Sequence, residues 1–414
     1  MTETFKLTKI RRRLAGETIS DVPAAVADEM LRFKGAIGRG DNIAIAVGSR
    51  GIANLSGIVR TIVEFVKGQG ADVFIVPAMG SHGGATGEGQ REVLAGYGIT
   101  EERMGAPVVS SMDVVELDSD GSPLRLFMDK AAHGADGVIL VNRVKPHTDY
   151  HGRYESGLVK MCVVGLGKRE QASEIHARGI YGLRELLAPA AERILATGHV
   201  IGGVAIVENA RDETMLVQAL EAGEFLQKEP DLLRIATDNM PLLPAGDIDV
   251  LVIDRIGKDI SGVGIDPNVI GRIGIRGVSD PDFPRIAAIV ALDLTEASHG
   301  NALGMGLADV TTRRLYEKID FGDTYANVYT STFLERAKIP VVAETDRDAV
   351  DFALQSARVP ERGRERIMRI SDTLHIEECY VSDALLAELR ERDDVEVLGE
   401  AAPPFDDDGA ITPF

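Results

Sequence analysis

The feature that most constrains the fold is a regular alternation of short apolar runs with segments of helical character. Predicted helices occupy 55–68 and 88–96, each directly after an apolar run and its turn. The runs are rich in Val and Ile and are apolar on both faces, as are strands of a sheet covered by helices. They lie at 42–47, 72–77, 137–142 and 203–208. The alternation predicts a doubly wound α/β domain.

A second α/β unit is predicted to begin near Pro244, with strands at 249–254, 288–293 and 339–343. At 414 residues the chain is too long for one ordinary core. We therefore expect the fold class α/β, with two domains at 1–243 and 244–414 and a cleft for cofactor and substrate between them. The final stretch, AAPPFDDDGAITPF, is acidic and Pro-rich, so we expect a loosely held tail.

The charge balance limits the partners. A net charge of −20 argues against a nucleic-acid partner and an anionic membrane surface, although a local basic pocket can still bind an anion. Two cysteines cannot build a disulfide framework, which favours a reducing, cytoplasmic location. The N-terminal MTETFKLTKIRRRL lacks the apolar region of a signal peptide, and no run approaches the ~20 apolar residues of a membrane helix. The sequence leaves the oligomeric state open.

Polar side chains follow successive predicted strands, where ligands bind in open α/β sheets. A single histidine after a strand is more often a loop or cap residue than a catalyst. Several cationic or imidazole groups at successive strand ends of an acidic chain, however, indicate a functional site. These residues are Ser49, Arg50, Ser81, His82, Asn142, Arg143, Lys145, His147, Glu208, Asn209, Arg211, Arg255 and Lys258.

Lys160 lies within the apolar run GLVKMCVV and has histidines on both sides in the sequence. It could extend its amine to solvent from a buried segment, or it could act as a nucleophile or carry a covalent adduct. His176 follows sixteen residues later, on a helix predicted at 170–178. Imidazole binds Zn, Cu, Fe or Ni, so a covalently held cofactor plus one histidine would explain a metal site without a full set of protein ligands.

The chain resembles the nickel-dependent lactate racemase family of 2-hydroxyacid racemases and epimerases. The resemblance runs over most of the chain, and its landmarks are GSRG at 48–51, GSHG at 80–83, KPH at 145–147, SGLVKM at 156–161 and EIH at 174–176. Members of this family carry a nickel pincer nucleotide, a pyridinium mononucleotide with thio-acid groups that is joined to a lysine through a thioamide. Its nickel is held by a ring carbon, two sulfurs and one histidine.

The resemblance implies a role for each matching residue. Lys160 would carry the cofactor, and His176 would bind nickel. His82 and His147 would be the two acid/base residues. Arg50 would contact cofactor or substrate. The interval from the Pro-His motif to the lysine is longer here than in the family's lactate racemases, so His151 is a rival to His147.

Lys258 resembles the family's substrate lysine in its placement after a strand of the second domain, and the substrate carboxylate needs such cations. Further cationic residues could favour a substrate larger or more anionic than lactate, such as malate, 2-hydroxyglutarate or a sugar acid; they are Arg143, Lys145, Arg153, Arg272 and Arg276. The partners implied are this small anionic 2-hydroxyacid and the enzymes that synthesise the cofactor.

Two other functions stay open from the sequence. The first is a metal-dependent hydrolase that uses His147, Asp149 and His151 to bind zinc. The second is a non-catalytic, two-domain protein that binds a small anion, in which Lys160 only pairs with its charge. The residues favour a racemase or epimerase over both, on the strength of the resemblance.

Overall fold

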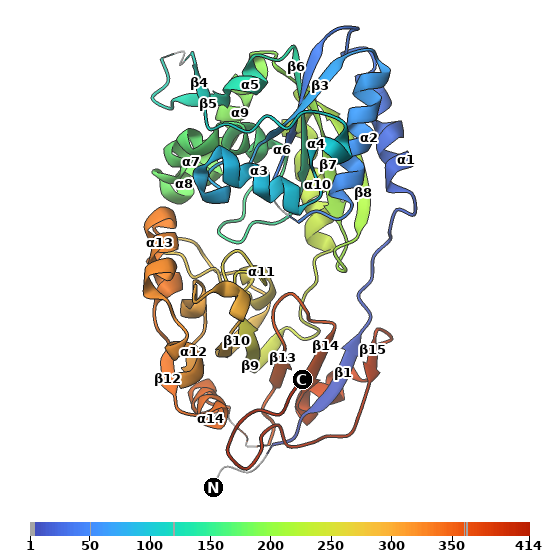
Figure 1. Ribbon diagram of the computed structural model, residues 1–414. Helices are drawn as coiled ribbons and strands as arrows, with labels where there is room; N and C mark the ends of the chain where they lie inside the picture. Colours follow the sequence, from blue (N-terminus) through green and yellow to red (C-terminus); the bar gives the residue numbers. More distant parts are fainter. Residues whose placement is uncertain (1–4, 50, 119–120, 360, 362) are drawn as a thin grey trace. The chain divides into compact units, whose positions relative to one another are not determined.

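A computed structural model describes residues 5–49, 51–118, 121–359, 361 and 363–414. The chain forms two compact α/β units (Figure 1). The N-terminal unit is Ala15–Met240. The C-terminal unit is Pro241–Phe414 together with the start of the chain as far as Leu14. The predicted fold class, α/β, is confirmed, whereas the predicted cleft between the units stays a prediction. Among the described residues, no helix combines the length and apolar character that crossing a membrane requires.

The N-terminal unit is built on a five-stranded sheet with the order β3-β2-β6-β7-β8. The first four strands are parallel, and β8 closes one edge antiparallel to β7. The strands are β2 (Asn42–Val47), β3 (Asp72–Pro77), β6 (Gly137–Arg143), β7 (Val200–Glu208) and β8 (Thr214–Glu221). A hairpin of β4 (Val114–Leu117) and β5 (Leu126–Asp129) lies outside this sheet.

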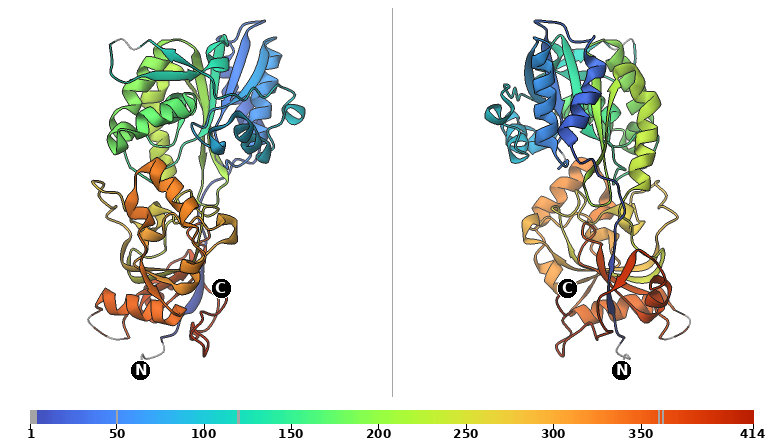
Figure 2. Two further views of the ribbon diagram at one scale, coloured as in Figure 1. Left: turned by 60° about the vertical axis from the view of Figure 1, so that its left-hand side comes forward. Right: turned by 90° about the vertical axis from the view of Figure 1, so that its right-hand side faces the viewer.

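Helices cover both faces of this sheet, which explains why its strands are apolar on both sides (Figures 1 and 2). One apolar core joins the sheet to α1 and α2, and the other joins it to the segments from α6 to α10. The helices are α1 (Val22–Met30), α2 (Leu55–Gly68), α3 (Gly87–Gly96), α4 (Glu101–Met104), α5 (Lys130–His133), α6 (Leu158–Lys160), α7 (Lys168–His176), α8 (Gly179–Glu185), α9 (Leu187–Ala196) and α10 (Phe225–Asp238).

The C-terminal unit contains an eight-stranded mixed sheet with the order β12-β11-β10-β9-β13-β14-β1-β15. The five strands from β12 to β13 are parallel, and the remaining pairings are antiparallel. The strands are β1 (Thr8–Arg12), β9 (Asp247–Ile256), β10 (Arg285–Leu294), β11 (Val310–Thr312), β12 (Val341–Ala343), β13 (Ile367–Ile370), β14 (Glu378–Val381) and β15 (Val395–Val397). The helices are α11 (Pro267–Ile270), α12 (Arg313–Glu317), α13 (Phe321–Ser331), α14 (Asp346–Ala357) and α15 (Asp383–Leu389).

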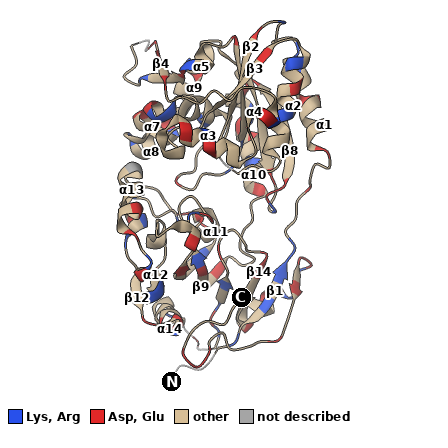
Figure 3. Ribbon diagram, in the orientation of Figure 1, with Lys and Arg blue, Asp and Glu red and all other residues tan. Residues whose placement is uncertain are grey.

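The start of the chain belongs to the C-terminal unit, unlike the domain predicted at 1–243. Strand β1 lies between β14 and β15. Its basic residues, blue on the ribbon of Figure 3, pair with carboxylates of the C-terminal unit. Lys9 Nζ lies 2.8 Å from a carboxylate oxygen of Glu378, and Arg12 Nε lies 2.9 Å from Asp394. The basic residues of β1 therefore pair with carboxylates that lie far along the chain.

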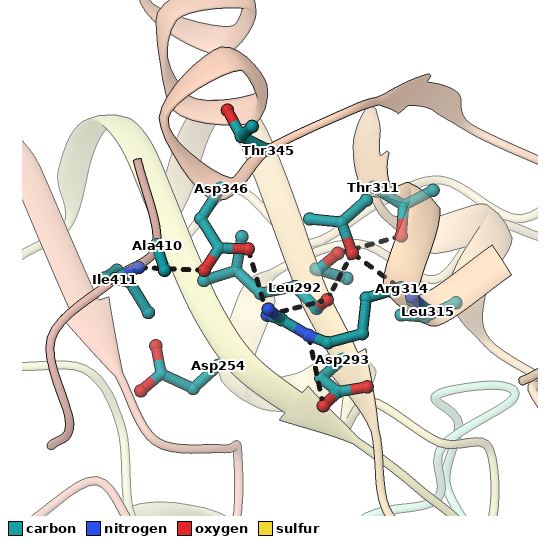
Figure 4. Close-up of polar contacts among 12 residues, drawn as sticks. Asp254, Leu292, Asp293, Thr311, Arg314, Leu315, Thr345, Asp346, Ala410 and Ile411 are labelled. Carbon is teal, nitrogen blue, oxygen red and sulfur yellow. Dashed lines mark hydrogen bonds and ion pairs between the residues drawn. The ribbon is translucent and has the colours of Figure 1, made fainter. Parts of the chain in front are cut away.

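The acidic tail is packed onto the C-terminal unit, which differs from the expectation of a loose tail. The Asp346 carboxylate accepts the backbone N–H of Ile411 at 2.9 Å and also the guanidinium of Arg314 (Figure 4). The Phe414 ring packs edge-on against Tyr380 with a centroid separation of 5.1 Å. These contacts join residues far apart in sequence, so the composition of the tail does not reveal them.

Candidate active site

His82 follows β3 at the carboxyl edge of the N-terminal sheet, and its side chain is exposed. Its Nδ1 is hydrogen-bonded to the hydroxyl of Ser49, which follows the neighbouring parallel strand β2. The Tyr97 hydroxyl donates to the Ser49 carbonyl oxygen at 2.5 Å and fixes that turn. Because the carboxyl ends of parallel strands meet at one edge, the sheet itself brings the predicted residues Ser49 and His82 together.

The loop that carries His82 lies against the turn that carries Lys160. Lys160 ends α6, a single helical turn, and a π-helical turn, Met161–Gly165, follows it directly. The Gly80 N–H donates to the Gly165 carbonyl oxygen at 3.3 Å. A Cβ on Gly165 would lie 2.7 Å from the Ala78 carbonyl oxygen, so a side chain there would force the two segments apart. Short π-helical turns of this kind occur often at functional sites.

His147 is buried and lies 2.5 Å, Nε2 to Nζ, from the amine of Lys160. Its other ring nitrogen, Nδ1, accepts the backbone N–H of Asp149 at 3.0 Å. The His147 ring also packs on the Tyr150 ring, with centroids 4.7 Å apart, and Lys160 Nζ lies 5.6 Å from the same ring centroid. The Glu155 carboxylate accepts the His147 backbone N–H at 2.5 Å. Glu155 is buried and lies on the same loop as His147, so a hydrogen bond within the loop fixes its backbone.

His151, the rival to His147, lies elsewhere on this loop. Its Nδ1 is 3.3 Å from both carboxylate oxygens of Glu155, and its side chain is 41% exposed. The hydrogen bond to Lys160 described above belongs to His147. The geometry therefore favours His147 as the histidine that acts with Lys160.

His176 ends α7 and lies within electrostatic range of Lys160. Burial lowers the pKa of His176, and the positive charge of Lys160 lowers it further, while Asp149 opposes both effects. The neutral imidazole that results is the form that binds metals. Within the described parts of the chain, no three or more His, Cys, Asp or Glu side chains are grouped so that they could hold a metal ion.

Two fully buried residues connect the His82 loop to the helix of His176. Gln90 donates from its amide to the carbonyl oxygens of Gly80, at 2.9 Å, and His82, at 3.2 Å. Lys168, the first residue of α7, donates to the Gln90 side-chain oxygen at 3.2 Å and pairs with Asp129 at 3.0 Å. Burial lowers the pKa of Lys168, and the Asp129 carboxylate opposes that effect. A continuous polar network thus links the loop of one candidate site residue to the helix of another.

Glu229, on α10, contacts the backbone of the turn that carries Lys160. It is buried, and its Oε2 accepts the backbone N–H of Val159 at 2.9 Å. A Cβ on Gly157 would lie 2.5 Å from this carboxyl group, which explains the glycine. Burial raises the pKa of Glu229 to about 7, although its hydrogen bonds favour the ionised form. Its second oxygen, Oε1, has no hydrogen-bond partner among the described residues.

Lys258 lies in the C-terminal unit, in the loop after β9. The sequence analysis had predicted it there, as a cationic residue that follows a strand of the second domain. Its Nζ donates to the Gly262 carbonyl oxygen at 2.5 Å and to the side-chain oxygen of Asn327 at 2.9 Å. Its backbone N–H donates to the Ser298 hydroxyl at 2.9 Å. Arg50, the remaining predicted site residue, lies outside the described residues.

Three of the arginines suggested as extra positive charge for the substrate already have carboxylate partners. The pairs are Arg143 with Glu208, Arg272 with Asp309 and Arg276 with Glu335. Arg272 also donates to the Ile286 carbonyl oxygen, near the start of β10. It therefore lies at the amino edge of that sheet, whereas Lys258 follows the carboxyl end of β9. This placement weighs against the suggestion that Arg272 adds positive charge for the substrate near Lys258.

The sequence did not identify Gln90, Lys168, Asp129 or Glu229 as part of the site's support. Each is a polar residue on a helix or at a strand end, with no motif of its own. The one available signal was the charged Lys168 directly after the Gly-Leu-Gly turn. Burial and partners of this kind depend on contacts between distant segments, so they appear only in the folded chain.

Comparison with solved structures shows that the fold is similar to known ones. No protein-family model matches the sequence, and no curated protein matches it. Among solved structures, the chain is similar to the lactate racemase apoprotein from Thermoanaerobacterium thermosaccharolyticum, with a TM-score of 0.54 and 13% sequence identity. The similarity covers 89% of this chain and 98% of that chain. At this identity it shows that the two chains share a fold.

Proposed function

We propose that this protein is a racemase or epimerase of a 2-hydroxyacid that uses a nickel pincer nucleotide attached to Lys160. The observation that carries the proposal is the arrangement around that amine. Lys160 is hydrogen-bonded to His147, lies within electrostatic range of His176, and stands on a turn packed against the His82 loop. The fold shared with a lactate racemase apoprotein supports the same conclusion.

The residues present fit such a cofactor. Lys160 is half-buried, so its amine can be reached while its stem stays packed. His176 has the lowered pKa of an imidazole that stays neutral and able to bind a metal near neutral pH. Nickel accepts imidazole nitrogen as a ligand. Lys160 would hold the nucleotide and His176 would bind its nickel, and the bound cofactor would supply an acceptor for hydride.

The side chains of this chain would handle the proton. The Cα–H of a 2-hydroxyacid is a poor acid, and its removal as hydride is easier when a base takes the hydroxyl proton. The two enantiomers present their hydroxyl groups in different directions, so two bases are needed. His82 and His147 supply them, because imidazole titrates near working pH. Lys258 and Arg50 would bind the substrate carboxylate.

The hydrogen-bonded contact between His147 and Lys160 weighs against the zinc hydrolase. Zinc bound by His147 would need one of its ring nitrogens, but one faces Lys160 and the other accepts a backbone N–H. His151 is likewise engaged with Glu155. Zinc binding would therefore require these contacts to break.

Racemisation in D₂O tests the proposed function. A single enantiomer of each candidate acid is added to protein produced together with the cofactor-synthesis enzymes. The expected product is the acid inverted at C2, which is the other enantiomer of lactate, malate or 2-hydroxyglutarate and the C2 epimer of gluconate. It should retain ordinary hydrogen at Cα, because the proposed mechanism would return the same hydride to that carbon without exchange. Deuterium at Cα would contradict the hydride mechanism. The panel is lactate, malate, 2-hydroxyglutarate and gluconate, and lactate as clearly the best substrate would count against a larger or more anionic substrate.

A further inference from the structure

The side chain of Gln90 is held in one orientation by its surroundings. Its amide nitrogen lies 2.9 Å from the carbonyl oxygen of Gly80 and 3.2 Å from that of His82, and a carbonyl oxygen can only accept. Its oxygen lies 3.2 Å from Nζ of Lys168, and an ammonium group can only donate. Gln90 is fully buried, so a lost hydrogen bond would leave a polar group unsatisfied. Both N–H groups of the amide therefore point at the backbone of the His82 loop.

Lys168 is the group that orients Gln90. Three oxygen atoms surround its Nζ, at 2.5 Å for the Pro77 carbonyl, 3.0 Å for the Asp129 carboxylate and 3.2 Å for Gln90. Each of the three N–H groups of the ammonium has an acceptor in this set. Lys168 also adopts a φ of +55°, in the left-handed region that favours glycine. The backbone alone would favour glycine here, so the contacts of the side chain explain the lysine.

The loop that Gln90 holds is the one that directs the His82 imidazole. This loop lies directly against the first turn of α3, where a Cβ on Gly89 would lie 2.1 Å from the Gly83 carbonyl oxygen. The Nδ1 of His82 is hydrogen-bonded to the hydroxyl of Ser49, which follows the neighbouring strand. Because Gln90 fixes the backbone and Ser49 contacts the ring, the position and the direction of the imidazole are both set.

We propose that Gln90 is a positioning residue for His82: it holds the backbone of the loop where the imidazole can act on the substrate hydroxyl. This inference rests on the proposed function. A base must lie within hydrogen-bond distance of the proton that it takes, and a displacement of about 1 Å can cost on the order of 10²-fold in rate. Lys168 begins α7, the helix that ends at His176, so the same contacts tie the loop of the proposed base to the helix of the proposed nickel ligand.

Gln90→Glu removes the two donors and keeps the size of the side chain. The carboxylate can still accept from Lys168, but it offers no N–H to the His82 loop. The matched control is Gln171→Glu, at a second fully buried glutamine, whose amide donates to the Arg125 carbonyl oxygen instead. Gln90→Met, with an apolar side chain of similar length, takes the place of Gln90→Glu if the buried carboxylate prevents folding.

Nuclear magnetic resonance of the cofactor-free protein gives a readout that does not depend on turnover. The histidine ring nitrogens are labelled with ¹⁵N, and His82 is assigned by the signals that His82→Gln removes. In Gln90→Glu, the Nδ1 resonance of His82 should shift in the same direction as in Ser49→Ala, because the displaced loop no longer holds the ring against the hydroxyl. Gln171→Glu should leave the resonance in place. An unmoved resonance in Gln90→Glu, or an equal shift in Gln171→Glu, would overturn the proposal.

A double-mutant cycle on protein loaded with cofactor tests whether Gln90 acts through His82. We expect Gln90→Glu to lower kcat by about tenfold or more in the wild-type background. In the His82→Gln background the same substitution should change kcat by less than about twofold, because no imidazole is left to position. An equal loss in both backgrounds would show a general structural effect and would overturn the proposal.

The two experiments separate this inference from the proposed function. A loaded wild type that inverts no acid of the panel overturns the proposed function, whereas the resonance comparison still decides whether Gln90 positions the His82 ring. Racemisation by the wild type, together with an unmoved Nδ1 resonance in Gln90→Glu, overturns only the role of Gln90.

Discussion

Replacing His82 by glutamine should lower kcat for racemisation by about 10²–10⁴-fold, the usual contribution of a positioned acid/base residue. The substituted amide keeps the size and hydrogen bonding of the side chain but cannot take up a proton near neutral pH. The side chain of His82 is hydrogen-bonded to Ser49, whereas Lys160 is hydrogen-bonded to His147, so the variant should still acquire the cofactor. The measurement is kcat on fully loaded protein, with the intact mass as the check on loading.

His151→Gln is the control for this prediction, because it removes an imidazole from the neighbouring loop. We expect its kcat to stay close to the wild-type value, since His151 is engaged with Glu155. A full loss of activity in His151→Gln together with normal activity in His147→Gln would show that His151, and not His147, is the second acid/base residue. Normal turnover in loaded His82→Gln would remove His82 from the mechanism.

Glu229 should make the stability of the protein fall as the pH rises. Its pKa in the folded chain is about 7, above its ordinary value of 4.5, because burial disfavours the charged form. Between these two values the unfolded chain releases a proton that the folded chain retains. The stabilisation is therefore fully present below the lower value and is lost as the pH rises through the higher one, by about 3 kcal/mol in total.

Urea unfolding at pH 5 and pH 8 measures this effect. Glu229→Gln keeps the size of the side chain and an oxygen that can accept the Val159 N–H, but it cannot ionise. The variant should lose most of the wild type's pH-dependent decrease in the free energy of unfolding. Glu64→Gln, at an exposed glutamate, should keep that decrease. An equal decrease in Glu229→Gln and the wild type would show that Glu229 is not its source.

Much of the N-terminal sheet could be predicted from the sequence. Strands β2 and β3 and helix α2 have the predicted bounds, because continuous apolar runs and an amphipathic segment are local signals. The contact between Ser49 and His82 could also be predicted, because each residue follows one of two adjacent parallel strands and such strands end at the same edge of the sheet. Helix α7 begins two residues earlier than predicted, at Lys168, whose buried amine has partners elsewhere in the unit.

The features that the sequence did not predict all depend on contacts between distant segments. Strand β1 joins the C-terminal unit through Glu378 and Asp394, more than 300 residues away. The tail is held by Asp346, which is an ordinary helix residue in the sequence. Glu229 gives no local sign that it supports the Lys160 turn from another helix. Periodicity and turn chemistry carry no information about such pairings.

The most direct test of the central claim is the intact mass of the protein, with its nickel content, after production alongside the cofactor-synthesis enzymes. The wild type should be heavier by the mass of the nucleotide less one water and should contain nickel. Lys160→Arg, which keeps the positive charge but offers no amine, should show no covalent mass gain, and His176→Ala should keep the gain but hold less nickel. A wild-type protein that racemises a 2-hydroxyacid while Lys160 is unmodified, or a mass gain that persists in Lys160→Arg, would contradict the account.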